Sequence, residues 1–288
     1  MEEKENDCVK YPLFDKIKDG ELEDFKDYIP VKEYGIKVDD SLNIDIVAID
    51  QKFGLKGYEN SYDDVVAIEC KYQTNINYAI QTALAQAILY QTSFKKVYIA
   101  VNKDGPGPSY YVKNILERTG IGLITVKTAN NKETSKEIKI GIPANSSKSN
   151  FFCESLYEKN TAHRAFLIAA FARACDANGY SKRNLYIGWD GSKKNLLHIW
   201  MEMPIIKDKL RIGCAYSLKL NENEPGEVEE AALRLSIRGL DPDKSIKEQI
   251  AEEFHTKDNG KKRGDNLEWD YNLKDLMKTK KNEDIEEK

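Results

Sequence analysis

The chain has 288 residues, of which 41% are hydrophobic and 32% charged, and its formal net charge is −4. This composition supplies a real core and so excludes wholesale disorder, while the length allows one large or two ordinary domains. The acidic balance argues against a non-specific nucleic-acid coat protein, and no apolar run approaches the ~20 residues that span a bilayer, so we expect a cytoplasmic protein without a membrane partner.

The amino-terminal segment and the cysteines narrow the class further. Residues 1–7 are too acidic for a secretory signal or an organellar transit peptide. The five cysteines are widely spaced and include no CxxC pair, so neither a zinc site nor a disulfide framework is indicated. We expect most of them to be buried apolar thiols.

The first half of the chain alternates between strand-like and helix-like spacing of its apolar residues. The segments 42–49 and 65–71 are rich in β-branched residues and bounded by polar turns, which is typical of strands. In 75–94, apolar residues recur at spacings of four and three, which puts them on one face of a helix. This pattern predicts an α/β domain with a mixed β-sheet flanked by helices. The expected elements are a helix at 10–28, strands at 31–38, 42–49 and 65–71, a helix at 75–94, a strand at 97–101, a helix at 110–119 that stops at Gly120, and a strand at 121–126.

The second half is patterned differently and follows a Ser/Asn-rich stretch at 144–150, which predicts a linker or an exposed loop. We therefore expect a first domain at 1–145, an α+β region of unrecognised type at 151–277, and a charged, flexible tail at 278–288. The middle region would serve substrate recognition or dimerisation. Its expected elements are a helix at 161–177, strands at 185–189, 196–203 and 211–218, and helices at 227–238 and 245–254.

The segment Val65–Lys71 carries two charges where a buried strand normally has none. Side chains alternate between the two faces of a strand, so Glu69 and Lys71 project on the same side as Ala67. Charges at the end of an apolar strand are costly unless they are paired or bind a metal ion. The alternative is a partly exposed edge strand whose Glu69 and Lys71 form a surface ion pair of little worth.

The preceding strand has the same irregularity, because Asp45 interrupts an apolar run. If the two strands pair as a hairpin, Asp45 and Glu69 can meet at one edge of the sheet. Two carboxylates held close together repel each other unless a cation lies between them, and Mg²⁺ prefers such oxygen ligands. That ion would polarise a phosphoryl oxygen and activate a water molecule, while Lys71 would position the hydroxide and stabilise charge on the phosphate.

An aspartate followed, after a long spacer, by Glu-x-Lys behind a hydrophobic triplet resembles the signature of the PD-(D/E)XK nucleases. The proline of that signature is absent, since Ile44 precedes Asp45. Gln86 and Tyr90 are similar to the Q-x-x-x-Y element that follows Glu-x-Lys in several branches of the family. The resemblance covers about residues 10–130 and implies a restriction-endonuclease-like core, so the domain at 1–145 would be nuclease-like.

The resemblance implies a role for each matching residue. Asp45, Glu69 and the backbone carbonyl of Cys70 would bind Mg²⁺, with Mn²⁺ expected to substitute for it, and Lys71 would be the catalytic lysine. For Gln86 and Tyr90, packing in the core is as good an explanation as a role in the site. The further candidates are Glu33 as an upstream acidic residue, and Gln86 and Tyr90.

Three short basic clusters in the second half could reach phosphates from loops, although a solvated turn is the simpler explanation of each. These candidates for nucleic-acid contact are Lys182 with Arg183, Lys193 with Lys194, and Lys261, Lys262 and Arg263.

Taken together, these features predict a magnesium-dependent endonuclease that hydrolyses DNA phosphodiester bonds, most naturally in double-stranded DNA, with a restriction or other defence role. A homodimer with two-fold symmetry would supply the two cuts that a duplex needs. Two alternatives stay open. One is a non-catalytic nucleic-acid-binding or regulatory module with a relic nuclease fold, and the other is a nuclease acting on RNA or branched DNA.

Overall fold

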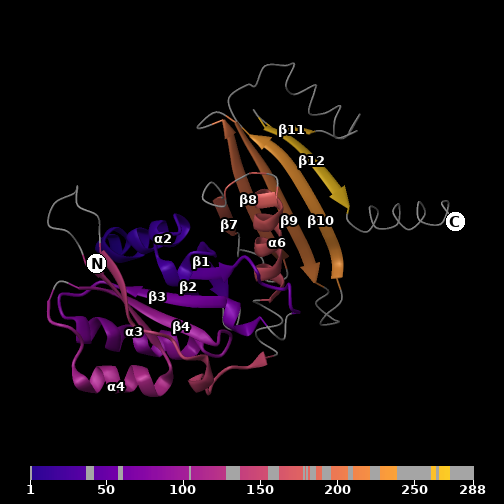
Figure 1. Ribbon diagram of the computed structural model, residues 1–288. Helices are drawn as coiled ribbons and strands as arrows, with labels where there is room; N and C mark the ends of the chain where they lie inside the picture. The colour runs from indigo at the N-terminus through magenta and orange to yellow at the C-terminus, as the bar shows by residue number, and fades with distance from the viewer. Residues whose placement is uncertain are drawn as a thin grey trace. The chain divides into compact units, whose positions relative to one another are not determined.

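The computed structural model divides the chain into two compact units, residues 1–183 and residues 184–288 (Figure 1). From residue 188 onward only the backbone is described. Among the described residues, no helix is both long and apolar enough to cross a membrane. The structure describes residues 2–36, 42–57, 61–103, 105–127, 137–154, 162–177, 179, 181, 186–189, 196–206, 210–220, 228–238, 261–263 and 266–272.

The first unit is built on an open, six-stranded sheet in the order β1-β2-β3-β4-β5-β6. The first three strands are antiparallel neighbours, β3, β4 and β5 run parallel, and β6 returns antiparallel to β5. The expected mixed α/β sheet is therefore confirmed. The strands are β1 (Tyr28–Ile36), β2 (Leu42–Asp50), β3 (Val65–Lys71), β4 (Lys96–Asn102), β5 (Gly122–Lys127) and β6 (Glu137–Ile142).

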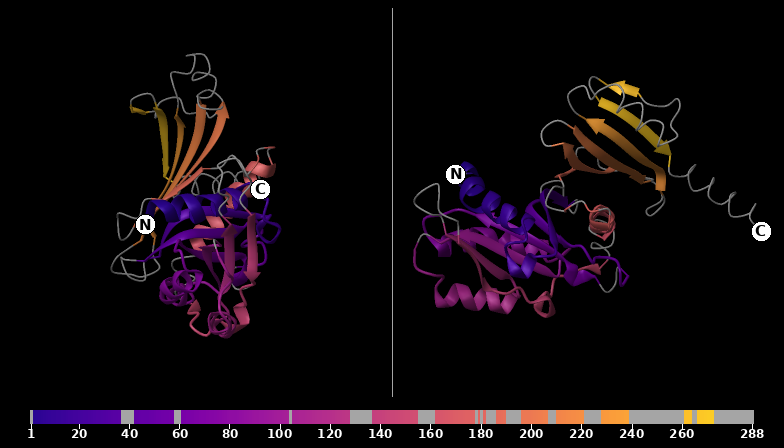
Figure 2. Two further views of the ribbon diagram at one scale, coloured as in Figure 1. Left: turned by 90° about the vertical axis from the view of Figure 1, so that its left-hand side faces the viewer. Right: turned by 45° about the horizontal axis from the view of Figure 1, so that its top comes forward.

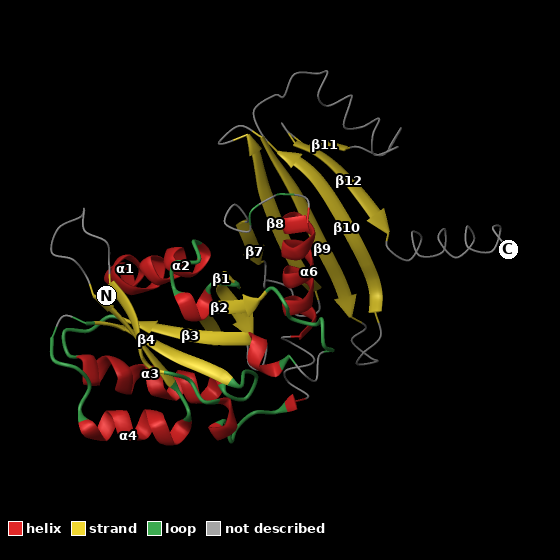
Figure 3. Cartoon of the chain, viewed as in Figure 1, coloured by secondary structure: helices red, strands yellow, loops and turns green. Residues whose placement is uncertain are grey.

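Helices cover both faces of this sheet, as the views in Figure 2 and the colouring in Figure 3 show. On the first face lie three amino-terminal helices: α1 (Glu2–Glu5), the π-helix η1 (Asn6–Lys10) and α2 (Tyr11–Lys18). Their apolar side chains form a core with alternate residues of the strands, among which β3 contributes Val66, Ile68 and Cys70. We call this side of the sheet the α2 face.

The opposite side, the α3 face, is covered by α3 (Ile76–Tyr90) and α4 (Tyr110–Thr119). Both helices begin with a side-chain cap, because Asn75 accepts from the N–H groups of the first turn of α3 and Ser109 does the same for α4. Gly120 ends α4 with a φ of 73°, a left-handed conformation that favours glycine and that confirms the predicted stop. The predicted apolar stripe of α3 is buried: Ile76, Ile80, Ala83, Ala87 and Tyr90.

One prediction for the first unit was wrong, and one strand was missed. A single helix over 10–28 is replaced by helical turns from Glu2 to Lys18, a short 3-10 helix at Glu23–Phe25 and the start of β1 at Tyr28. Gly20, with a φ of 67°, interrupts the helical path. Strand β6 was missed because its residues, Glu-Ile-Lys-Ile-Gly-Ile, alternate on a half-exposed edge and follow a polar stretch.

The stretch at 144–150 belongs to the first unit and is joined to the rest of it by backbone hydrogen bonds. Asn145 donates its N–H to the carbonyl of Gly120 at 2.9 Å, and a 3-10 helix follows at Ser146–Lys148. Helix α6 (His163–Ala177), which was expected from residue 161, belongs to this unit as well, and Arg173 donates to the carbonyl of Phe53 at 2.9 Å. The boundary between the two units therefore falls after Arg183, later than the stretch at 144–150.

The second unit is an antiparallel sheet in the order β11-β12-β10-β9-β8-β7. The three predicted strands are present, but the predicted helix at 227–238 is wrong, because these residues form β10. Leu233, Leu235 and Ile237 alternate with polar residues there, a period of two that outweighs the helix-favouring Glu and Ala. The predicted helix at 245–254 and tail at 278–288 lie outside the described residues. The strands are β7 (Tyr186–Trp189), β8 (Leu196–Ile206), β9 (Leu210–Leu220), β10 (Val228–Arg238), β11 (Lys261–Arg263) and β12 (Asn266–Asn272).

Candidate functional site

The two strands that carry the predicted site separate at the site itself. β2 pairs with β3 only as far as Ile46 and Ile68, and beyond that point β2 pairs with β1 and β3 pairs with β4. Asp45 and Glu69 are the next residues on each strand, so they lie at a fork in the sheet. A fork removes ladder hydrogen bonds, and the backbone groups released there need other partners.

Asp45 supplies one of those partners. One carboxylate oxygen accepts the N–H of Cys70 at 2.8 Å, and the other lies 3.1 Å from the ammonium nitrogen of Lys10. The side chain thus replaces a strand-to-strand bond and ties β2 to β3 where the backbones part. Lys10 is only 6% exposed, so its charge and that of Asp45 compensate each other in a largely dry environment.

Glu69 is buried, with 1% of its surface exposed, and lies on a strand in the interior of the sheet. Its Oε1 is 2.8 Å from the Nζ of Lys71, and its Oε2 is 2.8 Å from the hydroxyl of Tyr90. The alternative of a surface ion pair on an exposed edge strand is therefore wrong. A carboxylate this far from water is costly, and the surrounding groups compensate for it.

Tyr90 bridges the fork from α3. Its hydroxyl lies 2.9 Å from the carbonyl oxygen of Asn43 on β2 and 2.8 Å from Glu69 on β3. The phenol has one hydrogen and can donate it fully to only one of these acceptors. A protonated Glu69 satisfies both contacts, because it donates to Tyr90 while Tyr90 donates to Asn43.

Two residues that were not among the predicted candidates complete the charge network. Glu5, at the end of α1, lies 3.6 Å from the Nζ of Lys71, and Lys10, at the end of η1, contacts Asp45. A partial signal for Lys10 is its place beside the buried Val9 in a helical stretch. No strand pattern links either residue to the site, because their approach depends on how the amino-terminal helices pack on the sheet.

The surroundings of Glu69 favour its protonated form. Burial first, and then the nearby charge of Asp45, raise the pKa of Glu69 to about 7 against the opposing influence of Lys71. Burial also raises the pKa of Glu5, against the influence of Lys71. Burial works to lower the pKa of Lys71, but Glu69 outweighs it and the pKa is raised, so this lysine stays charged at neutral pH.

The donor set suits a hard divalent cation. Asp45 and Glu69 offer carboxylate oxygens on adjoining strands, and their mutual repulsion is the electrostatic situation that such an ion relieves. Mg²⁺ commonly keeps several waters and needs only one or two carboxylates. No three acidic, histidine or cysteine side chains converge on a metal position within the part of the chain that the structure describes. Since Lys10 and Lys71 now contact the two acids, binding of an ion would require an ammonium group to give way.

The remaining predicted residues are not brought into this network. Glu33 lies in β1 opposite Asp45, between the residues paired with Ile44 and Ile46, and its side chain is not described. Gln86 is half-buried one turn before Tyr90, and none of the described contacts of the site involves it. Lys182, Arg183, Lys193 and Lys194 fall outside the described residues. Lys261, Lys262 and Arg263 form the edge strand β11 rather than a loop.

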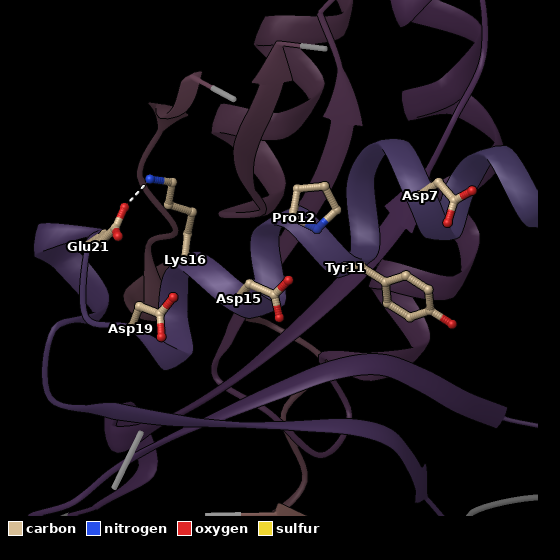
Figure 4. Close-up of a pocket in the computed structure, with 7 residues that line it drawn as sticks. All are labelled: Asp7, Tyr11, Pro12, Asp15, Lys16, Asp19 and Glu21. Carbon is tan, nitrogen blue, oxygen red and sulfur yellow. Dashed lines mark hydrogen bonds and ion pairs between the residues drawn. The ribbon is translucent and has the colours of Figure 1, made fainter. Parts of the chain in front are cut away.

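A hollow of about 340 Å³ lies elsewhere, along the exposed side of η1 and α2 (Figure 4). Asp7, Tyr11, Asp15 and Asp19 follow one another at every fourth position there, and Lys16 forms an ion pair with Glu21. This acidic lining would repel phosphates, so we do not assign the candidate chemistry to it.

In comparisons with known proteins, no family model, no curated protein and no solved structure matches the chain.

Proposed function

We propose that the first unit is a PD-(D/E)XK-type nuclease and that the protein is a magnesium-dependent endonuclease acting on DNA. The observation that carries the proposal is the fork at which Asp45 and Glu69 adjoin, with Lys71 in contact with Glu69 at 2.8 Å. A buried acid in a central strand has no structural advantage over an apolar residue. Its presence beside a second acid and a lysine is expected where the charges serve chemistry.

Each side chain has a distinct task in this proposal. Asp45 and Glu69 hold the cation, and Tyr90 orients Glu69 from α3. Lys71 keeps its proton, contacts the non-bridging oxygens of the scissile phosphate and orients the attacking water. Asp45 and Glu69 would hold a divalent ion, which would supply polarisation of a phosphoryl oxygen and a lower pKa for that water.

The protonation of Glu69 gives the proposal a pH dependence. A carboxylic acid must lose its proton to ligate a metal ion, and burial raises the pKa of this one to about 7. Metal binding and cleavage are therefore expected to rise with pH through the neutral range. The same proton gives the ion-free site a neutral form, which lowers the cost of burying two acids together.

Incubation of the purified protein with supercoiled and linear DNA and Mg²⁺ tests the proposal. Cleavage by the wild type, its loss on chelation and its loss in Asp45→Asn and Glu69→Gln are the expected results. Lys52→Ala is the matched control, because Lys52 is exposed and its ammonium group pairs with Asp27 at 3.9 Å, not with an acid of the site. Cleavage that survives both acid substitutions would refute the assignment, and a wild type that cuts no DNA would favour a relic fold without catalysis.

The biological role proposed is that of a restriction or other defence nuclease in the cytoplasm. The second unit would supply target recognition or a two-fold dimer contact that brings two sites to a duplex. Sedimentation of the full chain with and without DNA tests the dimer, and cleavage of modified against unmodified DNA tests the defence role.

A further inference from the structure

Three lysines end the three parallel strands of the first unit. Parallel neighbours finish at the same edge of a sheet. Lys71 is the last residue of β3, Lys103 follows the last residue of β4, and Lys127 is the last residue of β5. The N–H of Lys103 donates to the carbonyl of Val126 at 2.8 Å, so the ends of β4 and β5 lie side by side.

These lysines also share a face of the sheet. The residues that directly precede Lys71 and Lys127 are Cys70 and Val126, and both belong to the core of the α2 face. Because side chains alternate, the two lysines project toward the α3 face, on the same side as Glu69. The alternation of β4 puts Lys103 on that side as well, since Ala100 belongs to the α2-face core.

The edge stays basic beyond the site. Lys127 is paired across β5 and β6 with the exposed Glu137. A hydrogen bond from Lys139 and the charges of Lys139, Lys127 and Lys103 hold the pKa of that carboxyl below its usual value, so all three lysines lie near Glu137. Among these described residues, three lysines thus surround one acid at the end of β4 and β5.

Exposed tyrosines stand at the same edge. Helices α3 and α4 both start there, because each directly follows a parallel strand, and the N–H of Ser109 donates to Asn77 at 2.7 Å and joins the two helix starts. Tyr78 is 56% exposed on α3, and Tyr110 and Tyr111 are 74% and 78% exposed on α4. The rings of Tyr110 and Tyr111 lie edge to face with centroids 5.9 Å apart.

A small hollow lies at the start of α3, where Asn77 in its lining directly precedes Tyr78. Its volume is about 120 Å³. Thr74, in its lining, is three residues after Lys71, so their Cα atoms are at most ~11 Å apart along the chain. A nucleotide bound there would lie within about that distance of Lys71. The lining residues are Thr74, Asn75, Ile76, Asn77, Asn102, Gly105 and Pro106.

We propose that this lysine–tyrosine edge, made of Lys71, Lys103, Lys127, Tyr78, Tyr110 and Tyr111, binds a single-stranded segment of DNA beside the candidate site. The inference rests on the proposed function and adds that the DNA substrate has a single-stranded segment beside the site. Lysines at successive strand ends follow a phosphate backbone, and tyrosine rings stack on bases whose faces are free. A duplex buries those faces within its own stack, so exposed rings give it no comparable contact.

Binding of end-labelled oligothymidine and of a blunt duplex, measured by fluorescence anisotropy with Ca²⁺ in place of Mg²⁺, tests the proposal. The full-length wild type is expected to prefer the single strand. Tyr110→Ala and Tyr111→Ala should each weaken that binding by about tenfold, the loss of one stacking contact, while Tyr110→Phe and Tyr111→Phe retain it. Phe151→Ala, at another aromatic that is 52% exposed, is the matched control and should bind as the wild type does.

The lysines are tested by the salt dependence of the same binding. Lys103→Gln and Lys127→Gln should each reduce the slope of log affinity against log salt by about 0.7. Lys52→Gln should leave the slope unchanged. A duplex preference, or alanine variants that bind the single strand as tightly as the phenylalanine variants, would overturn the assignment of this edge.

The outcomes separate this inference from the proposed function. Tyrosine-dependent binding of the single strand without cleavage in Mg²⁺ would support the edge and refute the nuclease. Cleavage that needs Glu69 but is indifferent to Tyr110 and Tyr111 in both rate and binding would support the nuclease and refute the edge. Circular dichroism melting of each variant identifies any that has lost its fold, and the phenylalanine variants keep the test valid in that case.

Discussion

The two faces of β3 are buried to nearly the same degree and serve different ends. On the α2 face, Val66, Ile68 and Cys70 are all apolar and join one core with the amino-terminal helices. On the α3 face, Ala67 is followed by Glu69 and Lys71, so an apolar surface changes to a charged one within two positions. The degree of burial therefore does not distinguish structural positions on this strand from candidate catalytic ones. The free-energy cost of burying the side chain does, because it is high only for the charged residues.

The difference predicts that the two faces respond oppositely to substitution. Loss of an apolar side chain on the α2 face removes stabilising contacts. Loss of charge at Glu69 removes a desolvated anion that folding must accommodate. Stability should therefore depend on the first face, and metal binding and cleavage on the second.

Glu69→Gln gives the largest expected effect. Glutamine retains the shape and hydrogen-bonding capacity of the side chain but offers a neutral, weaker ligand, so cleavage should fall by about a thousandfold or more. Thermal unfolding at pH 8 without metal should show a stability equal to or above that of the wild type. If Glu69→Gln lost activity only because it unfolded, Glu69 would contribute to stability, as the residues of the α2 face do.

Ile68→Ala, one residue away on the other face, should act in the reverse way. Its side chain is fully buried, and truncation to alanine should cost roughly 3–4 kcal/mol of unfolding free energy, measured by urea denaturation. The folded fraction should retain its metal affinity. A loss of metal affinity greater than the loss of folded protein would mean that the two faces are not independent.

The pH dependence of stability sharpens the contrast. The pKa of Glu69 is about 7 in the folded chain against an ordinary value of 4.5, so the folded state holds the proton more tightly. The associated stability is fully present below pH 4.5 and is lost as the pH rises through 7. Between these limits the wild type should lose about 3 kcal/mol relative to Glu69→Gln. If the unfolding free energies of the wild type and of Glu69→Gln changed with pH in parallel, this expectation would be contradicted.

Lys10→Met should have the smallest effect, and it should strengthen metal binding where Glu69→Gln weakens it. Lys10 holds an oxygen of Asp45 at 3.1 Å, so it competes with any cation for that carboxylate. Removing it while keeping an apolar stem should raise Mn²⁺ affinity by about fivefold in calorimetric titration, the equivalent of ~1 kcal/mol. Lys16→Met is the control on the same helical run, since Lys16 pairs with Glu21. Equal or weaker affinity in Lys10→Met would show that Lys10 assists the site.

The sequence was sufficient for the parts of the fold that local patterns determine. Alternation and turn residues indicated the bounds of β3 and of α4, and two charges at the end of an apolar strand identified Glu69 and Lys71 as candidates. The α3 stripe was found because its spacing of three and four is unambiguous. These features are local, so a single sequence contains them.

The remainder depends on contacts between distant segments. Glu5 and Lys10 reach the site only because a π-helical turn and α2 pack on the sheet, which no local pattern encodes. β10 was mistaken for a helix because its Glu and Ala favour helices, while its alternation gains from pairing with β9 and β12. The lysine–tyrosine edge likewise required the strand order that aligns the three parallel ends.

The most direct test of the central claim is the anomalous scattering of a crystal soaked in Mn²⁺ at pH 8. We expect one peak within coordination distance of a carboxylate oxygen of Asp45 and of Glu69, with the ammonium group of Lys10 displaced from Asp45. A crystal that binds Mn²⁺ only at other positions, with Asp45 still on Lys10 and Glu69 still on Lys71, would contradict it.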